Sequence, residues 1–166
     1  MVIHFGIVAL AALGLQLFVI YAPLGSGDTL RRVVFVFSYL LLAGFVLANL
    51  RRPGLLVIGL GLLLNFLAIA SNGGFMPVSP DTLERSGQRL TDISVGEWVP
   101  HSKDVLLARQ DTHLSFLTDT LVLKNPFGLR VFSIGDVIIG AGLVITLGEL
   151  FLPRVQRVSR DRASLT

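Results

Sequence analysis

Four long apolar runs, separated by polar clusters, dominate the pattern of the chain. They cover residues 2–22, 33–50, 54–71 and 132–152. A helix of about 20 residues is about 30 Å long, which matches the hydrocarbon thickness of a bilayer. The first run lacks the basic start and the A-x-A cleavage site of a secretory signal peptide, so we expect it to be retained. The pattern predicts an all-α integral membrane protein with four transmembrane helices, a single membrane domain over residues 1–166.

The connections between these runs differ greatly in length. Arg51-Arg52-Pro53-Gly54 is long enough only for a tight turn between antiparallel helices. Residues 72–131 form a long polar loop, in which Ser79 begins the pattern of a capped short helix. We expect this loop to be too short and too interrupted to have a core of its own. Pro153 closes the last helix, and residues 153–166 are expected to be a flexible basic tail.

The composition supports a membrane protein. Of the 166 residues, 52% are hydrophobic and only 15% are charged, and the mean hydropathy is +0.74. A soluble domain of this length needs more polar surface. The net charge of +3 comes mostly from arginines at the ends of the apolar runs, so it requires no nucleic acid as a partner. The absence of cysteine excludes disulfides, thiolate metal sites and cysteine nucleophiles.

The distribution of basic residues predicts the orientation. Four spans place both termini and the turn between the second and third helices on one side of the membrane. That side carries six arginines against one aspartate, whereas the long loop on the other side is nearly neutral. By the positive-inside rule, both termini are expected in the cytoplasm of a bacterial cell and residues 72–131 outside its inner membrane. Arg31 and Arg32, on the outer side, argue mildly against this orientation.

The sharpest local motif is Asn72-Gly73-Gly74, which leads into Met76-Pro77. Asparagine and glycine both tolerate the left-handed conformation that ends a helix, and proline prevents the helix from resuming. The motif therefore predicts a helix C-cap. Two successive glycines can also bring bare N–H groups toward an anion or a partner chain, so a binding function is the alternative.

Asn65 lies about two turns inside the third apolar run. An amide in hydrocarbon needs hydrogen-bond partners, and neighbouring helices usually supply them. We expect Asn65 to join helices, with Gln16 and Ser38 as candidate partners, and a ligand contact is the alternative. Two pairs of small residues, Gly59/Gly61 and Gly140/Gly142, also favour close contact between helices.

Two acidic residues are candidates for chemistry. Asp136 lies at the start of the fourth run, where an acid is a functional candidate. Ser133 and Asp136 also have the S-x-x-D spacing of a capping box, which explains Asp136 without chemistry. Asp119 precedes Asp136 by 17 residues. If the two carboxyl groups share a site, their pKa values separate and they can act as the acid and base of a hydrolase.

The order of these features resembles the lipoprotein signal peptidases, in which a final span opens with an acid and a second acid precedes it. This resemblance implies an aspartyl peptidase with Asp119 and Asp136 as catalytic residues. The chain departs from that pattern, because Asp119 lies in the polar loop instead of at the end of a helix. The asparagine-containing signatures around the two acids are also missing.

A second resemblance covers most of the chain. Asn72-Gly-Gly-Phe-Met-Pro77, Asp111-Thr-x-Leu-x-x-Leu-x-Asp119 and Phe132-Ser-Ile-Gly-Asp-Val137 resemble a family of small bacterial membrane proteins whose function is unknown. That family implies a location in the bacterial inner membrane and supplies no catalytic residue.

The favoured hypothesis for function is a non-enzymatic accessory or scaffold subunit, which packs against the bilayer and a larger membrane complex or itself. The alternative is a membrane-embedded aspartyl-type hydrolase. A third hypothesis, a transporter or channel, requires a polar path through the spans, and one asparagine and one glutamine at mid-depth provide it only if the protein forms an oligomer. His4, His101 and His113 have no metal-binding pattern, and we predict no metal and no cofactor.

Overall fold

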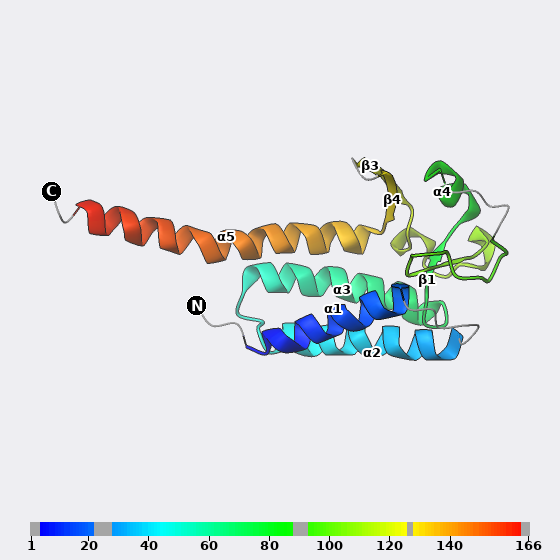
Figure 1. Ribbon diagram of the computed structural model, residues 1–166, viewed down its shortest axis with the longest axis horizontal. Coiled ribbons are helices and arrows are strands. Elements are labelled where there is room, and N and C mark those ends of the chain that lie inside the picture. The colour runs from blue at the N-terminus through cyan, green and yellow to red at the C-terminus, as the bar shows by residue number, and fades with distance from the viewer. Residues whose placement is uncertain (1–3, 22–27, 88–92, 126–127, 164–166) are drawn as a thin grey trace.

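The computed structural model describes residues 4–21, 28–87, 93–125 and 128–163. The elements follow one another along the chain in this order: α1 (Gly6–Tyr21), α2 (Asp28–Leu47), α3 (Pro53–Ser71), β1 (Met76–Val78), α4 (Pro80–Arg85), β2 (Asp104–Leu106), the 3-10 turns η2 (Arg109–Asp111) and η3 (Ser115–Leu117), β3 (Leu121–Asn125), β4 (Gly128–Phe132) and α5 (Ile134–Ala163). The helices α1, α2, α3 and α5 lie roughly side by side, and the strands and turns gather at one end of them (Figure 1).

Within the described ranges, three helices have the length and apolar character needed to cross a membrane. They are Thr29–Leu47 in α2, the whole of α3, and Ile134–Phe151 in α5. The first predicted span corresponds to α1, which is apolar but has only 16 residues. Such a helix is about 24 Å long, less than the hydrocarbon thickness of a bilayer. Residues 1–3 and 22 of the predicted span lie outside the described residues.

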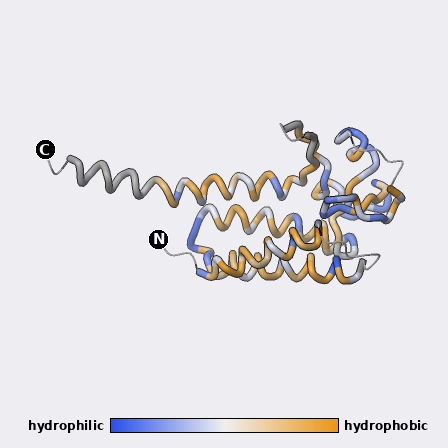
Figure 2. The backbone as a smooth tube through the Cα atoms, in the orientation of Figure 1, coloured by the Kyte–Doolittle hydropathy of each residue, from blue (hydrophilic) through white to orange (hydrophobic). Residues whose placement is uncertain are grey.

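The four long helices pack in two antiparallel pairs (Figure 1). α1 packs on α2, α5 packs on α3, and contacts between α2 and α3 join the two pairs. Among the residues that Figure 2 colours, apolar ones cover the helices, whereas polar ones gather at the helix ends and in residues 72–131, which we call the polar segment. Many large apolar side chains on α1, α2 and α5 are exposed, as expected of helices that face lipid.

The α3–α5 contact is lined by glycine on both sides. A Cβ atom at Gly61 would lie 2.6 Å from the carbonyl oxygen of Gly135, and one at Gly142 would lie 2.7 Å from the backbone nitrogen of Ile58. Close helix contact at Gly61 and Gly142 is therefore confirmed. Gly59 instead approaches Val46 of α2, where a Cβ would lie 2.7 Å from the valine side chain.

The polar segment contains β structure, whereas the predicted all-α fold had only a loop with one short helix here. β1 pairs in parallel with β2, with Pro77 opposite Val105, and β3 pairs antiparallel with β4. The expectation that this segment has no core is also wrong, because Val78, Leu83, Val99 and Leu106 form a small buried cluster. These residues come from separate apolar stretches of one to four residues, which are too short to give a periodic signal.

The short helix α4 confirms the prediction made from Ser79. The Thr82 N–H donates to Ser79 Oγ at 3.3 Å, and Pro80 occupies the first turn of the helix. The chain then turns at Gly87, whose φ of +78° is typical of glycine.

The predicted end of the last helix at Pro153 is wrong. α5 continues through this proline to Ala163. Proline removes one backbone hydrogen bond from a helix interior, but the residues that follow, such as Arg154, Gln156 and Arg157, favour helix.

Candidate functional site

A cluster of charged side chains lies where the polar segment meets the ends of α3 and α5. Its members are Lys103, Asp104, Asp119 and Asp136, with the polar residues Asn65, Ser102 and Ser133 around them. Strand pairing positions two of them: Asp104 begins β2, and Asp119 pairs with Val78 at the end of β1. Asp136 lies in the first turn of α5. We call these four charged residues the carboxyl–lysine cluster.

Asp136 caps α5 and also belongs to the cluster. The Asp136 N–H donates to Ser133 Oγ at 3.0 Å, and the Ser133 N–H donates to Asp136 Oδ2 at 3.1 Å. The predicted capping box is therefore confirmed. The same carboxylate accepts hydrogen bonds from Asn65 Nδ2 at 2.7 Å and from Lys103 Nζ at 2.8 Å.

Asn65 joins two helices, as predicted. Its side chain is fully buried, and its Oδ1 accepts a hydrogen bond from Ser133 Oγ at 2.8 Å. Its hydrogen bonds therefore reach the start of α5 instead of Gln16 or Ser38. Ser38 Oγ donates to the carbonyl oxygen of Phe35 in its own helix, at 2.6 Å.

Lys103 brings together the two acids that the sequence singled out. Its ammonium nitrogen lies 2.8 Å from Asp136 Oδ2 and 3.5 Å from Asp119 Oδ2. Burial opposes the charged form of Lys103, but the carboxylates of Asp119 and Asp136 outweigh it and raise the pKa of the lysine well above its usual value. Lys103 is therefore an ammonium ion at neutral pH.

Asp119 lies next to Asp104, a residue that the sequence analysis missed. Both oxygens of Asp119 and Oδ1 of Asp104 are buried without a hydrogen-bond donor, although the two carboxyl groups lie within hydrogen-bonding reach of each other. Two carboxylates repel each other, whereas a carboxyl group that holds a proton can donate it to the other, so this arrangement favours one proton on the pair.

The environments of the two groups decide which one holds the proton. Burial, followed by the charge of Asp104, raises the pKa of Asp119 well above its usual value. Burial also raises the pKa of Asp104. Lys103 opposes the rise of the pKa at both groups, but the hydroxyl of Ser102 opposes it at Asp104 alone. Ser102 Oγ donates to Asp104 Oδ2 at 2.6 Å. The arrangement therefore favours a protonated Asp119 beside an ionised Asp104.

A cavity of about 430 Å³ opens onto the cluster. It lies between the C-terminal half of α1, the N-terminal half of α5 and the polar segment. The lining residues include Leu17, Ile20, Tyr21, His101, Lys103, Asp104, Asp119, Asp136, Ile139, Gly140 and Leu143. One end of the cavity is polar and charged, and the rest of its wall is apolar.

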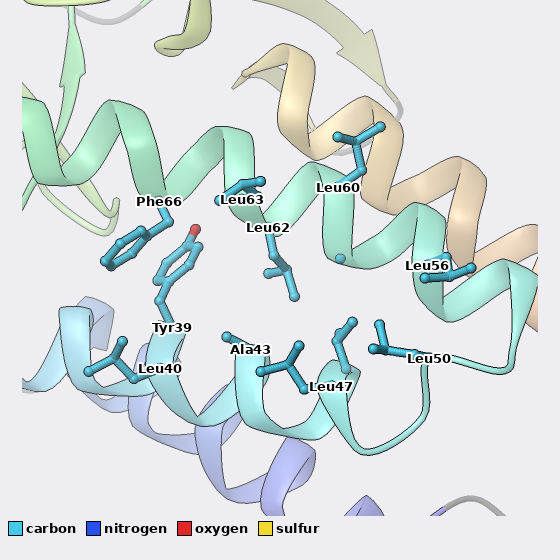
Figure 3. Close-up of a pocket in the computed structure, with 12 residues that line it drawn as sticks. Tyr39, Leu40, Ala43, Leu47, Leu50, Leu56, Leu60, Leu62, Leu63 and Phe66 are labelled. Carbon is cyan, nitrogen blue, oxygen red and sulfur yellow. The ribbon is translucent and has the colours of Figure 1, made fainter.

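A second cavity, of about 450 Å³, lies between α2 and α3 (Figure 3). Leu40, Ala43 and Leu47 of α2 face Leu62 and Phe66 of α3 across it. The hydroxyl group of Tyr39 points toward α3 in this view. No charged side chain lines this cavity, so it offers no group for acid–base chemistry.

The Asn72-Gly73-Gly74 motif ends α3, which confirms the predicted cap. Asn72 is the C-cap residue, and the Gly74 N–H donates to the carbonyl oxygen of Ile69 at 2.9 Å. The φ values of Gly73 and Gly74 are +75° and +91°. Since the cap uses the Gly74 N–H, that donor does not face an anion.

The Asn72 side chain also holds the polar segment. Its Nδ2 donates to the carbonyl oxygen of His113 and its Oδ1 accepts the His113 N–H, each at 2.8 Å. Met76 and Pro77 follow as buried residues of β1, and the Pro77 carbonyl accepts the Asp119 N–H at 3.4 Å. The motif therefore positions the segment that carries Asp119.

Lys103 and Asp104 were missed because Ser-Lys-Asp matches no catalytic motif. One weak signal was present: the chain has only two lysines among its 14 basic residues. A lysine ammonium is a compact point charge that can be held between carboxylates, unlike the planar group of arginine. Among the described residues, no group of three or more His, Asp or Glu side chains is arranged to hold a metal ion.

Comparison with known proteins agrees with the resemblance noted in the sequence. No curated protein and no solved structure matches the chain. A family model matches residues 1–147, which is most of the sequence. The chain belongs to DUF5317, a family of unknown function.

Proposed function

We propose that the protein is an aspartyl-type hydrolase of a bacterial inner membrane, with the carboxyl–lysine cluster as its active site. In this proposal α1, α2, α3 and α5 all cross the bilayer, with both termini in the cytoplasm. The apolar character of the four helices and the six arginines of the predicted cytoplasmic side support this topology. The cluster then faces the outer surface of the membrane.

The observation that carries the proposal is the pair of adjacent buried carboxyl groups, Asp104 and Asp119, at the edge of an open cavity. Buried ionisable groups at the end of a membrane helix bundle are costly, and they usually serve a function. An acid–base hydrolase also requires two carboxyl groups that differ in proton affinity, one to donate a proton and one to accept it.

The roles of the two groups follow from their environments. Ionised Asp104 accepts a proton from water while the water oxygen attacks a carbonyl carbon, and protonated Asp119 donates its proton to the carbonyl oxygen. The bond to the leaving group then breaks, and the leaving group takes the proton that Asp104 gained from water. As the carbonyl forms again, the hydroxyl of the intermediate returns its proton to Asp119. Lys103 lies beside Asp119 and stabilises negative charge as it develops.

This assignment changes the pair expected from the sequence. Asp119 and Asp136 meet at Lys103, but hydrogen bonds to Asn65, Lys103 and the Ser133 N–H occupy both oxygens of Asp136. Asp136 is therefore better suited to position the lysine than to activate water.

The test is hydrolysis of a fluorogenic fatty-acyl ester and of a lipid-modified peptide by the protein in proteoliposomes. Asp104→Asn and Asp119→Asn are each expected to lower the rate on the order of 10²–10⁴-fold, the usual contribution of a general acid or base. Asp111→Asn changes an exposed acid of the same segment and serves as the matched control. Turnover at the wild-type rate in folded Asp119→Asn would overturn the proposal.

An accessory subunit is the second candidate, and the exposure of α5 favours it. This helix packs chiefly on α3, and Val137, Leu143, Val144 and Phe151 are exposed along the rest of its surface. Lipid or another membrane protein can cover such a surface. Affinity purification from the native host in mild detergent, with the mass of the intact particle, tests this role. A stoichiometric larger partner supports it, and a lone monomer contradicts it.

A further inference from the structure

We propose that the ligand of the carboxyl–lysine cluster is an amphiphile with an uncharged polar group, such as an acyl ester or amide. It enters sideways from the lipid, through the cleft between α1 and α5. The inference deepens the proposed function, because it names the substrate class of that site and its route of entry.

The two ends of the cavity differ in chemistry along the direction of the helices. Leu17 and Ile20 of α1 face the cavity on one side, and Ile139 and Leu143 of α5 face it on the other. These four side chains belong to apolar helices and suit an acyl chain. Lys103 and its aspartates occupy the other end. An amphiphile lying along the helices would place its chain and its polar group in matching surroundings.

Gly140 leaves the α5 wall of this cleft open. A Cβ atom built at Gly140 would meet no atom within 4 Å, whereas one at Gly142, two residues later, would collide with Ile58. Gly142 therefore serves the contact between α3 and α5, and Gly140 does not. A larger side chain at Gly140 would extend into the cleft without disturbing helix packing.

The net charge of the cluster determines which polar group of a ligand can bind beside it. Three aspartates and one lysine line this end of the cavity, and the group keeps a net negative charge even with one proton on a carboxyl group. An anionic headgroup would be repelled in these partly buried surroundings. A neutral carbonyl instead accepts a hydrogen bond from Lys103 or from protonated Asp119.

Photolabelling in nanodiscs of phosphatidylcholine tests the cleft without requiring turnover. The probe is a diacylglycerol with a diazirine in one acyl chain, which is neutral and carries two esters. We expect adducts on α1 near Leu17 and Ile20 and on α5 near Ile139 and Leu143. Excess dioleoylglycerol should remove this labelling, and excess dioleoylphosphatidic acid should not.

Two variants that fill the cleft complete the test. Gly140→Leu acts from the α5 wall and Leu17→Trp from the α1 wall, and each is expected to lower the competable labelling severalfold. Gly44→Leu is the matched control, because a Cβ at Gly44 of α2 also meets no atom within 4 Å and lies away from this cavity. Thermal unfolding checks that all three variants fold.

The outcomes separate the two proposals. Wild-type labelling in both folded cleft variants, or competition by phosphatidic acid as strong as by diacylglycerol, overturns the lateral cleft. Asp119→Asn retains a neutral polar group beside Lys103, so it should still be labelled. If that variant both binds the probe and hydrolyses esters at the wild-type rate, the hydrolase proposal fails while the cleft stands.

Discussion

Asn65 in α3 and Asp136 in α5 are joined by a hydrogen bond of 2.7 Å between Asn65 Nδ2 and Asp136 Oδ1. This bond crosses the glycine-lined contact between the two helices. It leaves Asp136 Oδ2 to accept from Lys103, so the helix contact and the orientation of the carboxyl–lysine cluster depend on the same amide.

Replacing Asn65 should therefore weaken both the fold and the cluster. Asn65→Ala removes one bond to a charged group and one to Ser133, and we expect a loss of about 1–3 kcal/mol in the free energy of unfolding. Thermal unfolding in detergent measures this change. Asn65→Asp should be worse, because it replaces the donor to Asp136 with an oxygen. Equal stability of Asn65→Asp and wild type would contradict this account.

A second prediction concerns the close contact between Gly142 of α5 and α3. Gly142→Ala forces a methyl group against Ile58, and overpacking of this kind costs about 1–3 kcal/mol. Gly140→Ala is the matched control two residues away, where a methyl group meets open space and the unfolding temperature should stay near that of wild type. Similar destabilisation by both substitutions would contradict the role of close contact, because alanine has a higher helix propensity than glycine and this difference alone would stabilise both variants.

The raised pKa of Asp119 predicts how stability depends on pH. Since burial and Asp104 raise this pKa, the folded protein holds a proton that the unfolded chain releases near pH 4. The contribution of Asp119 to stability is complete below that pH and is lost as the pH rises toward the raised pKa. Asp119→Asn is neutral at every pH, so its unfolding temperature should fall less over this window than that of wild type.

The control for this titration is Asp111→Asn, which removes an exposed carboxyl group from η2. It should keep the wild-type dependence of unfolding temperature on pH. An Asp119→Asn curve parallel to wild type would mean that Asp119 is ionised in the folded protein.

The pairing of Asn72 with His113 should stabilise the polar segment locally. Asn72→Ala removes two hydrogen bonds to the His113 backbone and one to the Ala68 carbonyl, each contributing about 0.5–1.5 kcal/mol. We expect faster amide hydrogen exchange in η2 and η3, with little change in α5. Asn72→Asp keeps one acceptor but places a carboxylate oxygen against the His113 carbonyl, so it should increase exchange at least as much. Unchanged exchange in both variants would contradict the role of Asn72.

The parts of the fold that the sequence predicts well are those with local causes. The long apolar runs predict α2 and α3 closely, Ser79 predicts the start of α4, and Ser133 with Asp136 predicts the capping box. In each case the residues that form the interaction lie within a few positions of one another, so the spacing itself carries the information.

The parts that were missed depend on contacts between distant residues. β1 and β2 are three-residue strands that form only because Pro77 meets Val105. Lys103 lies 33 positions from Asp136, and no local pattern indicates that a lysine in a Ser-Lys-Asp turn will lie between two aspartates. The sequence was enough to select Asp119 and Asp136 as acids in a membrane protein. It did not indicate Lys103 and Asp104, the residues that determine how those acids are charged.

The distance along the chain between Asn65, Lys103 and Asp136 also has a consequence for biosynthesis. During synthesis, Lys103, Asp104 and Asp119 are made before the start of α5. Until α5 is made, Lys103 lacks the carboxylate of Asp136, and Asn65 lacks its hydrogen bonds to Asp136 and Ser133. Completion of the charged centre coincides with insertion of the last helix against the glycines of α3. A chain that stops before α5 therefore carries polar groups without their hydrogen-bond partners. Quality-control proteases can use these groups to distinguish incomplete chains from complete ones.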